Sequence, residues 1–322
     1  MFNGLDKLYQ AVLEWGGSSG GQIASPMGRE PVWVRRTVSG RTRSDLEQAV
    51  KESRTVLESV CVVGLGTVGG PTARYFARHG FPTYGCDINP QAAEGLGDTL
   101  LQSSTSLAEL PLADLFIVTV DTGFRGDEPI TANVFRACEA IRARGTPKLV
   151  SIESTVPVGT CRRVHQEVFG RRQRLVHVPH RWWAEDEARH GVGQTRVVGG
   201  VDEESVRLAV EFYAWAGIPL VPLSDIRVAE LCKAAENTDR YLQIAYAELL
   251  KMICDENRLD FEELRRGMNT KWNVEVLEAR DGIGGTCLPK DILYVKAAAP
   301  EVCHLLDGAR SVDKIYREHL GK

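Results

Sequence analysis

The sequence of 322 residues has no uninterrupted apolar run that approaches the roughly 20 residues of a membrane-spanning helix. Its first stretch, MFNGLDKLYQAVLEW, is broken by acidic and polar residues and therefore lacks the apolar centre of a signal peptide. The eight cysteines include no CxxC pair and no zinc-finger spacing, and a chain of this length does not depend on disulfides. We therefore expect a cytoplasmic protein without membrane segments or a metal site.

The sequence also lacks a strong charge of one sign. Its formal net charge is -4, which is neither the basic excess of a nucleic-acid-binding protein nor a membrane-surface signature. Two short basic runs, RRTVSGRTR at 35–43 and RRQR at 171–174, are interpreted as solvated loops. We expect neither nucleic acid nor a membrane among its partners.

The sequence does contain 43% hydrophobic residues, enough at this length for a substantial core and about two domains. Residues 1–57 are expected to form an N-terminal extension of a helix, a flexible Gly/Ser-rich tether and a second helix. Over 58–223, short apolar runs alternate with helical stretches, which predicts a parallel sheet covered by helices. The runs are SVCVVGLG, PTYGCDI, DLFIVTV, KLVSIES, RLVHVPH, TRVVGG and IPLVPLS. A long helical pattern from Ser224–Asp225 to about Asn257 then opens a helical domain over 224–322.

A glycine-rich turn follows the first of these runs. CVVGLGTVGG places Gly64, Gly66 and Gly69 in G-x-G-x-x-G spacing, with Thr67 and Val68 between the last two glycines. This spacing permits a tight turn, close approach of backbone to a pyrophosphate, and close packing of helix on strand. Asp87 ends the next predicted strand, where an acid binds the adenosine ribose hydroxyls.

These features predict an α/β fold in which a Rossmann-type, doubly wound parallel sheet is followed by an all-helical dimerisation domain. No arginine lies between Gly85 and Pro90 to bind a 2′-phosphate, so the predicted cofactor is NAD rather than NADP.

Three later segments carry the chemistry: SIESTVPVGT at 151–160, VAELCKAAENTDR at 228–240 and DGIGGTCLPKD at 281–291. In this order, downstream of a dinucleotide-binding pattern, they resemble the nucleotide-sugar dehydrogenase family, typified by UDP-glucose dehydrogenase. The similarity spans roughly residues 59 to 310. It implies oxidation of a sugar primary alcohol, on a nucleotide sugar or nucleoside, to the uronic acid.

That oxidation removes two hydrides and needs a group that holds the intermediate aldehyde. A cysteine thiolate can add to the aldehyde to give a thiohemiacetal and then a thioester that water cleaves, and Cys287 is the candidate. Asp291 shares its face if a helix begins at Pro289. The other seven cysteines are interpreted as buried apolar residues.

Lys233 and Asn237 are four residues apart and can project from one helix face into a common site. The resemblance implies that Lys233 stabilises the developing alkoxide and that Asn237 completes an oxyanion site. It also implies that Asp291 and Thr155 position water or relay protons. Glu230, one turn before Lys233, is predicted to be its partner.

The sequence departs from the family pattern in three places. His180 stands where the family has a glutamate that assists thioester hydrolysis; either it acts as a neutral base near its ordinary pKa or it caps a strand end, and Glu185 or Asp186 is an alternative carboxylate. RDG at 280–282 replaces Gly-Pro-Gly. The resemblance further predicts a UDP-binding third domain after the final segment, and the sequence is expected to lack it.

The leading hypothesis is therefore an NAD-dependent dehydrogenase, acting through Cys287 on a sugar or nucleotide sugar, as a homodimer formed through the long helix. Two alternatives are a two-electron alcohol dehydrogenase for a smaller substrate and a non-catalytic NAD-binding regulatory or scaffold homologue. Retention of Cys287 argues against the first. The complete set of Thr155, Lys233, Asn237, Cys287 and Asp291 argues against the second.

Overall fold

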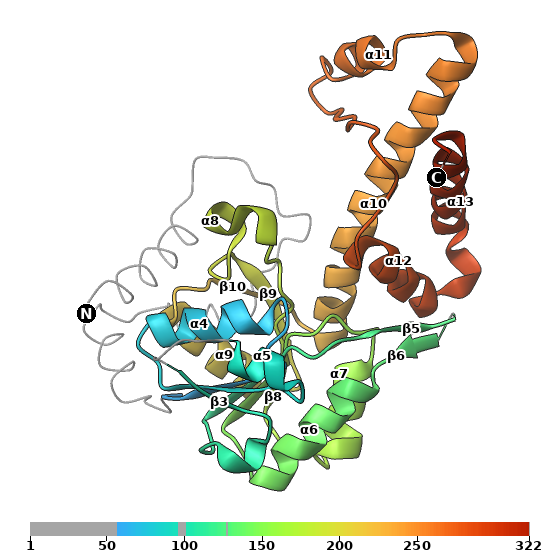
Figure 1. Cartoon of the computed structure of the whole chain (residues 1–322). Helices are drawn as coiled ribbons and strands as arrows, with labels where there is room; N and C mark the ends of the chain where they lie inside the picture. The colour runs from blue at the N-terminus through green and yellow to red at the C-terminus, as the bar shows by residue number, and fades with distance from the viewer. Residues whose placement is uncertain (1–56, 96–100, 127, 322) are drawn as a thin grey trace, which may run out of the picture.

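The computed structural model describes residues 57–95, 101–126 and 128–321 (Figure 1). The two helices and the tether predicted for the N-terminal extension lie outside these residues. Among the described helices, none is long and apolar enough to cross a membrane.

An eight-stranded sheet forms the centre of the first part of the chain. Its strands lie in the order β10-β9-β8-β7-β4-β1-β2-β3, and every neighbouring pair is parallel except β8 and β9. A separate antiparallel hairpin consists of β5 and β6. The strands are β1 Val60–Val63, β2 Thr83–Cys86, β3 Leu101–Ser104, β4 Leu115–Val118, β5 Gly123–Arg125, β6 Glu128–Ile130, β7 Leu149–Ile152, β8 Leu175–His177, β9 Arg196–Gly200 and β10 Leu220–Pro222.

Helices cover both faces of the sheet because successive strand residues point to opposite sides. In β1, Val60 and Val62 join the buried cluster that contains α4 and α9, whereas Cys61 and Val63 join the cluster that contains α6. The helices of this part are α4 Gly69–Arg78, α5 Pro90–Glu94, α6 Ala132–Arg144, α7 Thr160–Arg163, α8 Glu187–His190 and α9 Glu203–Trp215, with 3-10 turns η1 Leu107–Glu109 and η3 Ala184–Asp186 and a π-helical turn η2 Val164–Val168.

The predicted fold class is confirmed, since all seven predicted apolar runs contain strands of one mostly parallel sheet. The strands β3, β5 and β6 were not predicted. β3 has the sequence LQSS, and none of its residues is fully buried, so no apolar run marks it.

The second part of the chain is helical. Figure 1 shows α10 (Ile226–Asn257) projecting from the sheet, with α11 (Phe261–Met268) at its far end and α12 (Cys287–Ala298) and α13 (His304–His319) beside it. A short 3-10 turn, η4 (Pro300–Val302), joins α12 to α13. The predicted limits of the long helix are confirmed: Asp225 caps its start by accepting from the N–H of Arg227, and Asn257 is its last residue.

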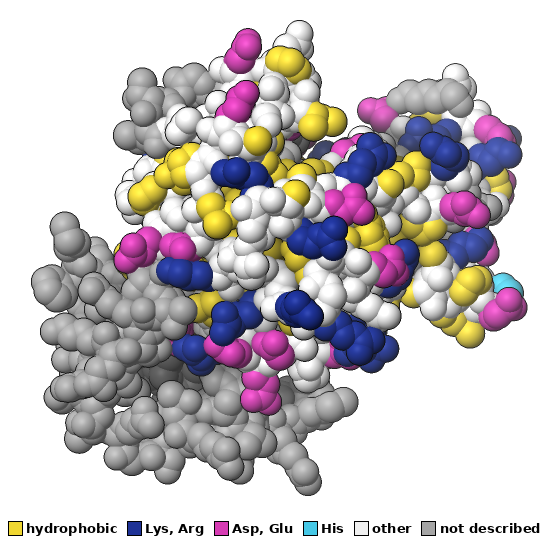
Figure 2. All heavy atoms as spheres, turned by 90° about the horizontal axis from the view of Figure 1, so that it is seen from below, with side chains coloured by type: hydrophobic (Ala, Val, Ile, Leu, Met, Phe, Trp, Pro, Cys, Tyr) yellow, Lys and Arg dark blue, Asp and Glu magenta, His cyan; other side chains and the backbone are white. Residues whose placement is uncertain are grey.

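The base of α10 lies tightly against the sheet. A Cβ atom added to Gly199 of β9 would lie 2.6 Å from Cα of Ile226, so only glycine permits this approach. On the face of the molecule seen in Figure 2, basic and acidic side chains are intermixed rather than gathered by sign.

Candidate active site

The glycine turn joins β1 to α4 at the point where the strand order reverses, which is where open α/β sheets bind nucleotides. Gly64 has a φ of +93°, and a Cβ there would lie 2.7 Å from the carbonyl oxygen of Thr119. A Cβ on Gly69 would lie 1.7 Å from the carbonyl oxygen of Gly64, whereas the space around Gly66 is open. Gly64 and Gly69 therefore allow the tight turn, and Gly66 leaves room for a ligand.

The residues around this turn fit a dinucleotide. Gly66 and Thr67 are exposed, Val68 is half-buried, and no side chain caps the start of α4, so its first N–H groups can bind an anion. Asp87 follows β2 and accepts hydrogen bonds from the N–H groups of Leu65 at 2.6 Å and Asn89 at 2.8 Å. Its carboxylate is thereby fixed beside the glycine turn.

Asn237 and Asp291 join α10 to α12. The Asn237 amide donates to Oδ2 of Asp291 at 2.5 Å, and Asp291 is only 1% exposed. Burial raises the pKa of Asp291, while the charges of Lys290 and Lys233 and the bond from Asn237 oppose that rise. Lys290 Nζ lies 3.9 Å from Oδ1 of Asp291. The site therefore holds a buried carboxylate, and the charges of two lysines lower its pKa against the larger effect of burial.

Cys287 is exposed and is the first residue of α12. The helix thus starts two residues earlier than the predicted start at Pro289, and Asp291 is one turn after the thiol on the same face. Six of the other cysteines are buried, as predicted, whereas Cys232 is half-buried and contacts Glu236 at 3.4 Å. Cys287 is the accessible thiol at a helix start in this part of the protein.

Two further side chains link α12 to the sheet. Thr122, after β4, donates to the carbonyl oxygen of Thr155 at 2.7 Å, and Lys290 Nζ contacts the Thr122 hydroxyl at 3.4 Å. The sequence reasoning missed both residues. The available signals were that Thr122 follows a predicted strand and that Lys290 precedes Asp291.

His180 is buried three residues after the end of β8, an interior strand of the sheet. Its Nε2 contacts the carboxylate of Glu153, and it also lies 3.2 Å from Thr72 Oγ1 and from Arg196 Nη1. Burial and the charge of Arg196 hold the pKa of His180 below its ordinary value, which corrects the expectation of an ordinary pKa. Because Nε2 faces a carboxylate, we assign the ring proton to it; Nδ1 is buried and has no hydrogen-bond partner among the described residues.

The predicted pairing of Glu230 with Lys233 is wrong. Glu230 instead accepts from the N–H groups of Gly159 at 2.6 Å and Cys161 at 2.7 Å, at the start of α7. Helix spacing brings the two residues near each other, but the carboxylate turns toward unpaired backbone donors. Lys233 is half-buried, and its charge lowers the pKa of both His180 and Asp291.

The two alternative carboxylates lie in the segment that follows His180. Glu185 is exposed, and Asp186 caps α8 by accepting from the N–H of Arg189.

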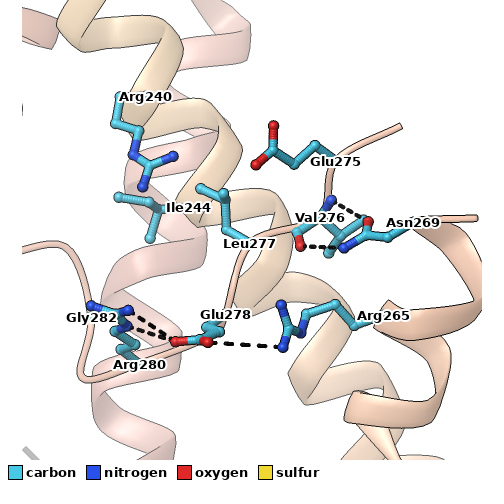
Figure 3. Close-up of a pocket in the computed structure, with 10 residues that line it drawn as sticks. All are labelled: Arg240, Ile244, Arg265, Asn269, Glu275, Val276, Leu277, Glu278, Arg280 and Gly282. Atoms are coloured by element: carbon cyan, nitrogen blue, oxygen red, sulfur yellow. Dashed lines mark hydrogen bonds and ion pairs between the residues drawn. The ribbon is translucent and has the colours of Figure 1, made fainter. Parts of the chain in front are cut away.

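A pocket of about 330 Å³ lies between α10, α11 and the segment that leads to Cys287 (Figure 3). Three arginines and two glutamates share its rim, and Glu278 pairs with Arg280 at 2.9 Å and approaches Arg265 at 3.9 Å. Its lining residues are Arg240, Ile244, Arg265, Asn269, Glu275, Val276, Leu277, Glu278, Arg280 and Gly282.

Two family models match this chain. Residues 93–216 match the NAD binding domain, and residues 227–315 match the central domain, of the UDP-glucose/GDP-mannose dehydrogenase family. An NDP-N-acetyl-D-galactosaminuronic acid dehydrogenase of Ralstonia nicotianae is 30% identical over 79% of this chain and 68% of its own length. A UDP-N-acetyl-D-mannosamine dehydrogenase of Campylobacter jejuni is 29% identical over 79% and 71%.

A solved structure shows the same relationship in three dimensions. The UDP-D-ManNAc dehydrogenase of Pyrococcus horikoshii superposes with a TM-score of 0.72 at 27% identity, over 80% of this chain and 68% of that one. The chain therefore belongs to the UDP-glucose/GDP-mannose dehydrogenase family. It is an NAD-dependent oxidoreductase of the nucleotide-sugar dehydrogenase type.

Proposed function

We propose that this protein oxidises the primary alcohol of a nucleotide sugar to the uronic acid through a covalent intermediate on Cys287. The observation that carries the proposal is the Asn237–Asp291 hydrogen bond, which joins α10 to α12 one turn from an exposed thiol. Lys233 lies one turn before Asn237 on α10. A nucleophile, a cation, an amide donor and a buried carboxylate thus come from two helices.

The proposed substrate is a UDP-N-acetylhexosamine. The names of the similar proteins support it, since they are dehydrogenases of UDP-N-acetyl-D-mannosamine and of an NDP-N-acetyl-D-galactosaminuronic acid.

NAD, when bound, would supply the hydride acceptor for each oxidation, with one NAD consumed per hydride. We propose that the backbone at Gly66 and Thr67 and the start of α4 bind its pyrophosphate and that Asp87 binds the adenosine ribose. The exposed Ile88 beside Asp87 offers an apolar surface for the adenine.

In the proposed reaction, the alcohol first loses a hydride from carbon to the cofactor and its hydroxyl proton to water, and becomes an aldehyde. The thiolate of Cys287 then adds to the aldehyde carbon, the carbonyl π bond breaks, and an alkoxide remains. Lys233 and Asn237 stabilise that oxygen. Loss of a second hydride from the same carbon gives a thioester, and water cleaves the C–S bond, releasing the carboxylate and restoring the thiol.

We propose that Asp291 and Thr155 position the hydrolytic water and that Asp291 accepts its proton. The raised pKa of Asp291 suits this role, because a stronger base takes the proton more readily. Burial lowers the pKa of His180 and weakens it as a base, so we do not assign it the transfer of this proton.

We also propose a homodimer, a division between the two domains at residue 224 and a cytoplasmic location. Apolar side chains on one exposed face of α10, Tyr246, Leu249 and Ile253, support the dimer because a second copy would cover them.

The test compares wild-type protein with Cys287→Ser, using UDP-N-acetyl-D-mannosamine and NAD. We expect two NADH per molecule of acid from the wild type, and loss of acid with NAD binding retained in the variant. Cys232→Ser, which alters a half-buried thiol, is the matched control and should keep the wild-type ratio. An unaffected Cys287→Ser would reject the covalent mechanism. One NADH per molecule of an aldehyde product from the wild type would favour a two-electron dehydrogenase, and no turnover by any form with NAD bound would favour a non-catalytic homologue.

A further inference from the structure

The segment 280–283 leads into the turn before Cys287, and α13 holds it in place. Ile283 is 1% exposed and packs in a cluster with residues of α10, α12 and α13. Its N–H donates to Oδ1 of Asp313 at 2.7 Å, and its carbonyl oxygen accepts from Arg317. Both backbone polar groups of one residue are therefore bound by side chains of a single helix.

These side chains also bind one another. Nε of Arg317 lies 3.2 Å from both carboxylate oxygens of Asp313. The hydroxyl of Tyr316 donates to the carbonyl oxygen of Arg280 at 2.8 Å. One turn of α13 thus holds the segment at Arg280 and at Ile283. The ion pair of Asp313 with Arg317 fixes the geometry of the contact with Ile283.

The glycines divide this stretch into a tight half and an open half. Gly282 has a φ of +90°, and a Cβ there would lie 2.9 Å from Cγ of Arg317. Around Gly284 and Gly285, no atom lies within 4 Å of an added Cβ. The backbone is therefore packed against α13 up to Ile283, and only Gly284, Gly285 and Thr286 separate that fixed point from Cys287.

We propose that Asp313 and Arg317 are positioning residues for Cys287. By fixing Ile283, they set the point from which the Gly-Gly-Thr turn carries the thiol toward the substrate. The proposal rests on the function proposed above for Cys287. It assigns α13, which supplies none of the reacting groups, a part in the thiol-dependent half of the reaction.

The expected effect is on rate rather than on substrate binding. Addition of a thiolate to a carbonyl requires the reacting atoms at about 3–3.5 Å, and a displacement of about 1 Å can cost roughly 100-fold. Arg280 and Gly282 also line the pocket in Figure 3, so a loosened segment would change that surface as well.

The test uses Asp313→Ala, Asp313→Asn and the control Lys314→Ala, all in the full-length protein. Lys314 is the neighbouring residue on α13, and its side chain is 79% exposed. With UDP-N-acetyl-D-mannosamine and NAD, we expect Asp313→Ala to lower kcat for acid formation about 10-fold or more, with KM and NAD affinity within about threefold of wild type. Asp313→Asn keeps an oxygen that can accept from Ile283, so it should recover part of the rate, and Lys314→Ala should match wild type.

A second measurement needs no substrate: the rate at which iodoacetamide alkylates Cys287, read by peptide mass spectrometry so that Cys232 is scored separately. We expect Asp313→Ala to change this rate at least threefold. Asp313→Asn should give a rate between those of wild type and Asp313→Ala, and Lys314→Ala should leave the rate unchanged. Wild-type alkylation and kcat in Asp313→Ala would overturn the proposal. If Asp313→Ala does not fold, the same two measurements are made on Asp313→Asn, and wild-type values of both would overturn the proposal. If the function proposed for Cys287 is wrong, the wild-type protein will form no acid. The alkylation rates would still test whether Asp313 positions the thiol.

Discussion

Glu248 is a buried carboxylate on α10 that faces α13. It is fully buried, and neither oxygen has a hydrogen-bond partner among the described residues. Burial and the negative charge of Asp313 raise its pKa to about 7, while Arg317 opposes the rise. Tyr241 and Tyr316 are the other titratable groups coupled to it. This carboxyl is therefore one group through which pH acts on the contact between α10 and α13; the ion pair of His319 with Asp255 is another.

The first prediction is a loss of stability as pH rises. The folded protein holds the proton of Glu248 more tightly than the unfolded chain, in which the carboxyl keeps its ordinary pKa of 4.5. Its contribution to stability is therefore fully present below about pH 4.5 and lost as pH rises through 7. Glu248→Gln should match wild type at pH 5 and exceed it by roughly 1–3 kcal/mol at pH 8, since one pKa unit corresponds to about 1.4 kcal/mol.

The measurement is urea unfolding at the two pH values. Glu256→Gln, at an exposed position on the same helix, is the control and should show no such difference. Equal pH dependence in wild type and Glu248→Gln would contradict the assignment.

At single positions, the sequence predicted which residues belong to the site better than it predicted their contacts. The Cys287, Asn237 and Asp291 pattern indicated a common site, and the bond between Asn237 and Asp291 joins two of these residues. The pKa of His180 could not be predicted, because its buried partners Glu153 and Arg196 are 27 and 16 residues away along the chain. Contacts of this kind depend on how the strands are ordered, which local spacing does not reveal.

At the scale of elements, a short hydrogen bond to the buried carboxylate of Asp291 adds to the apolar packing between α10 and α12. The second prediction is that Asn237→Ala and Asp291→Ala, each of which removes the hydrogen bond, are strongly coupled in their effects on stability. A double-mutant cycle on unfolding free energy should give about 1.5–3 kcal/mol, the range for hydrogen bonds to charged groups. Loss of Asn237 leaves the carboxylate buried with fewer partners, so Asn237→Ala alone should destabilise the protein.

The exposed pair Asp239 and Gln243, 2.7 Å apart on the same helix, is the matched control. Its cycle should give about 0.5 kcal/mol or less, as is typical of i,i+4 surface pairs. A coupling no larger for Asn237 and Asp291 would mean that the bond does not hold the two helices together.

The elements that sequence predicts well are those marked by apolar periodicity. Seven strand runs and the limits of α10 follow from it, whereas β3 is polar and the strands of the β5–β6 hairpin, GFR and EPI, each include a charged residue and form no apolar run. The contacts of α13 with residues 280–283 were not predicted either. Asp313 bonds a backbone group 30 residues earlier, and backbone groups leave no mark in the amino-acid pattern.

At the scale of the whole molecule, the third prediction concerns assembly. If α10 forms a homodimer through Tyr246, Leu249 and Ile253, light scattering at micromolar concentration should give twice the chain mass of 35.5 kDa. Leu249→Glu places a charge in that surface and should shift the protein to the monomer. Leu112→Glu changes another exposed leucine, outside α10, and should remain dimeric. A monomeric wild type would reject the dimer.

The tight approach of Gly199 to Ile226 holds the base of α10 against the sheet, so a tilt of the helix would turn about that contact. Its 32 residues form a rod about 48 Å long, at about 1.5 Å per residue. A tilt of one degree at the base would move the far end by about 0.8 Å but Asn237 by only about 0.3 Å. A small tilt at the sheet would therefore displace α11 more than the residues around Asn237, which lie close to the fixed base of the helix.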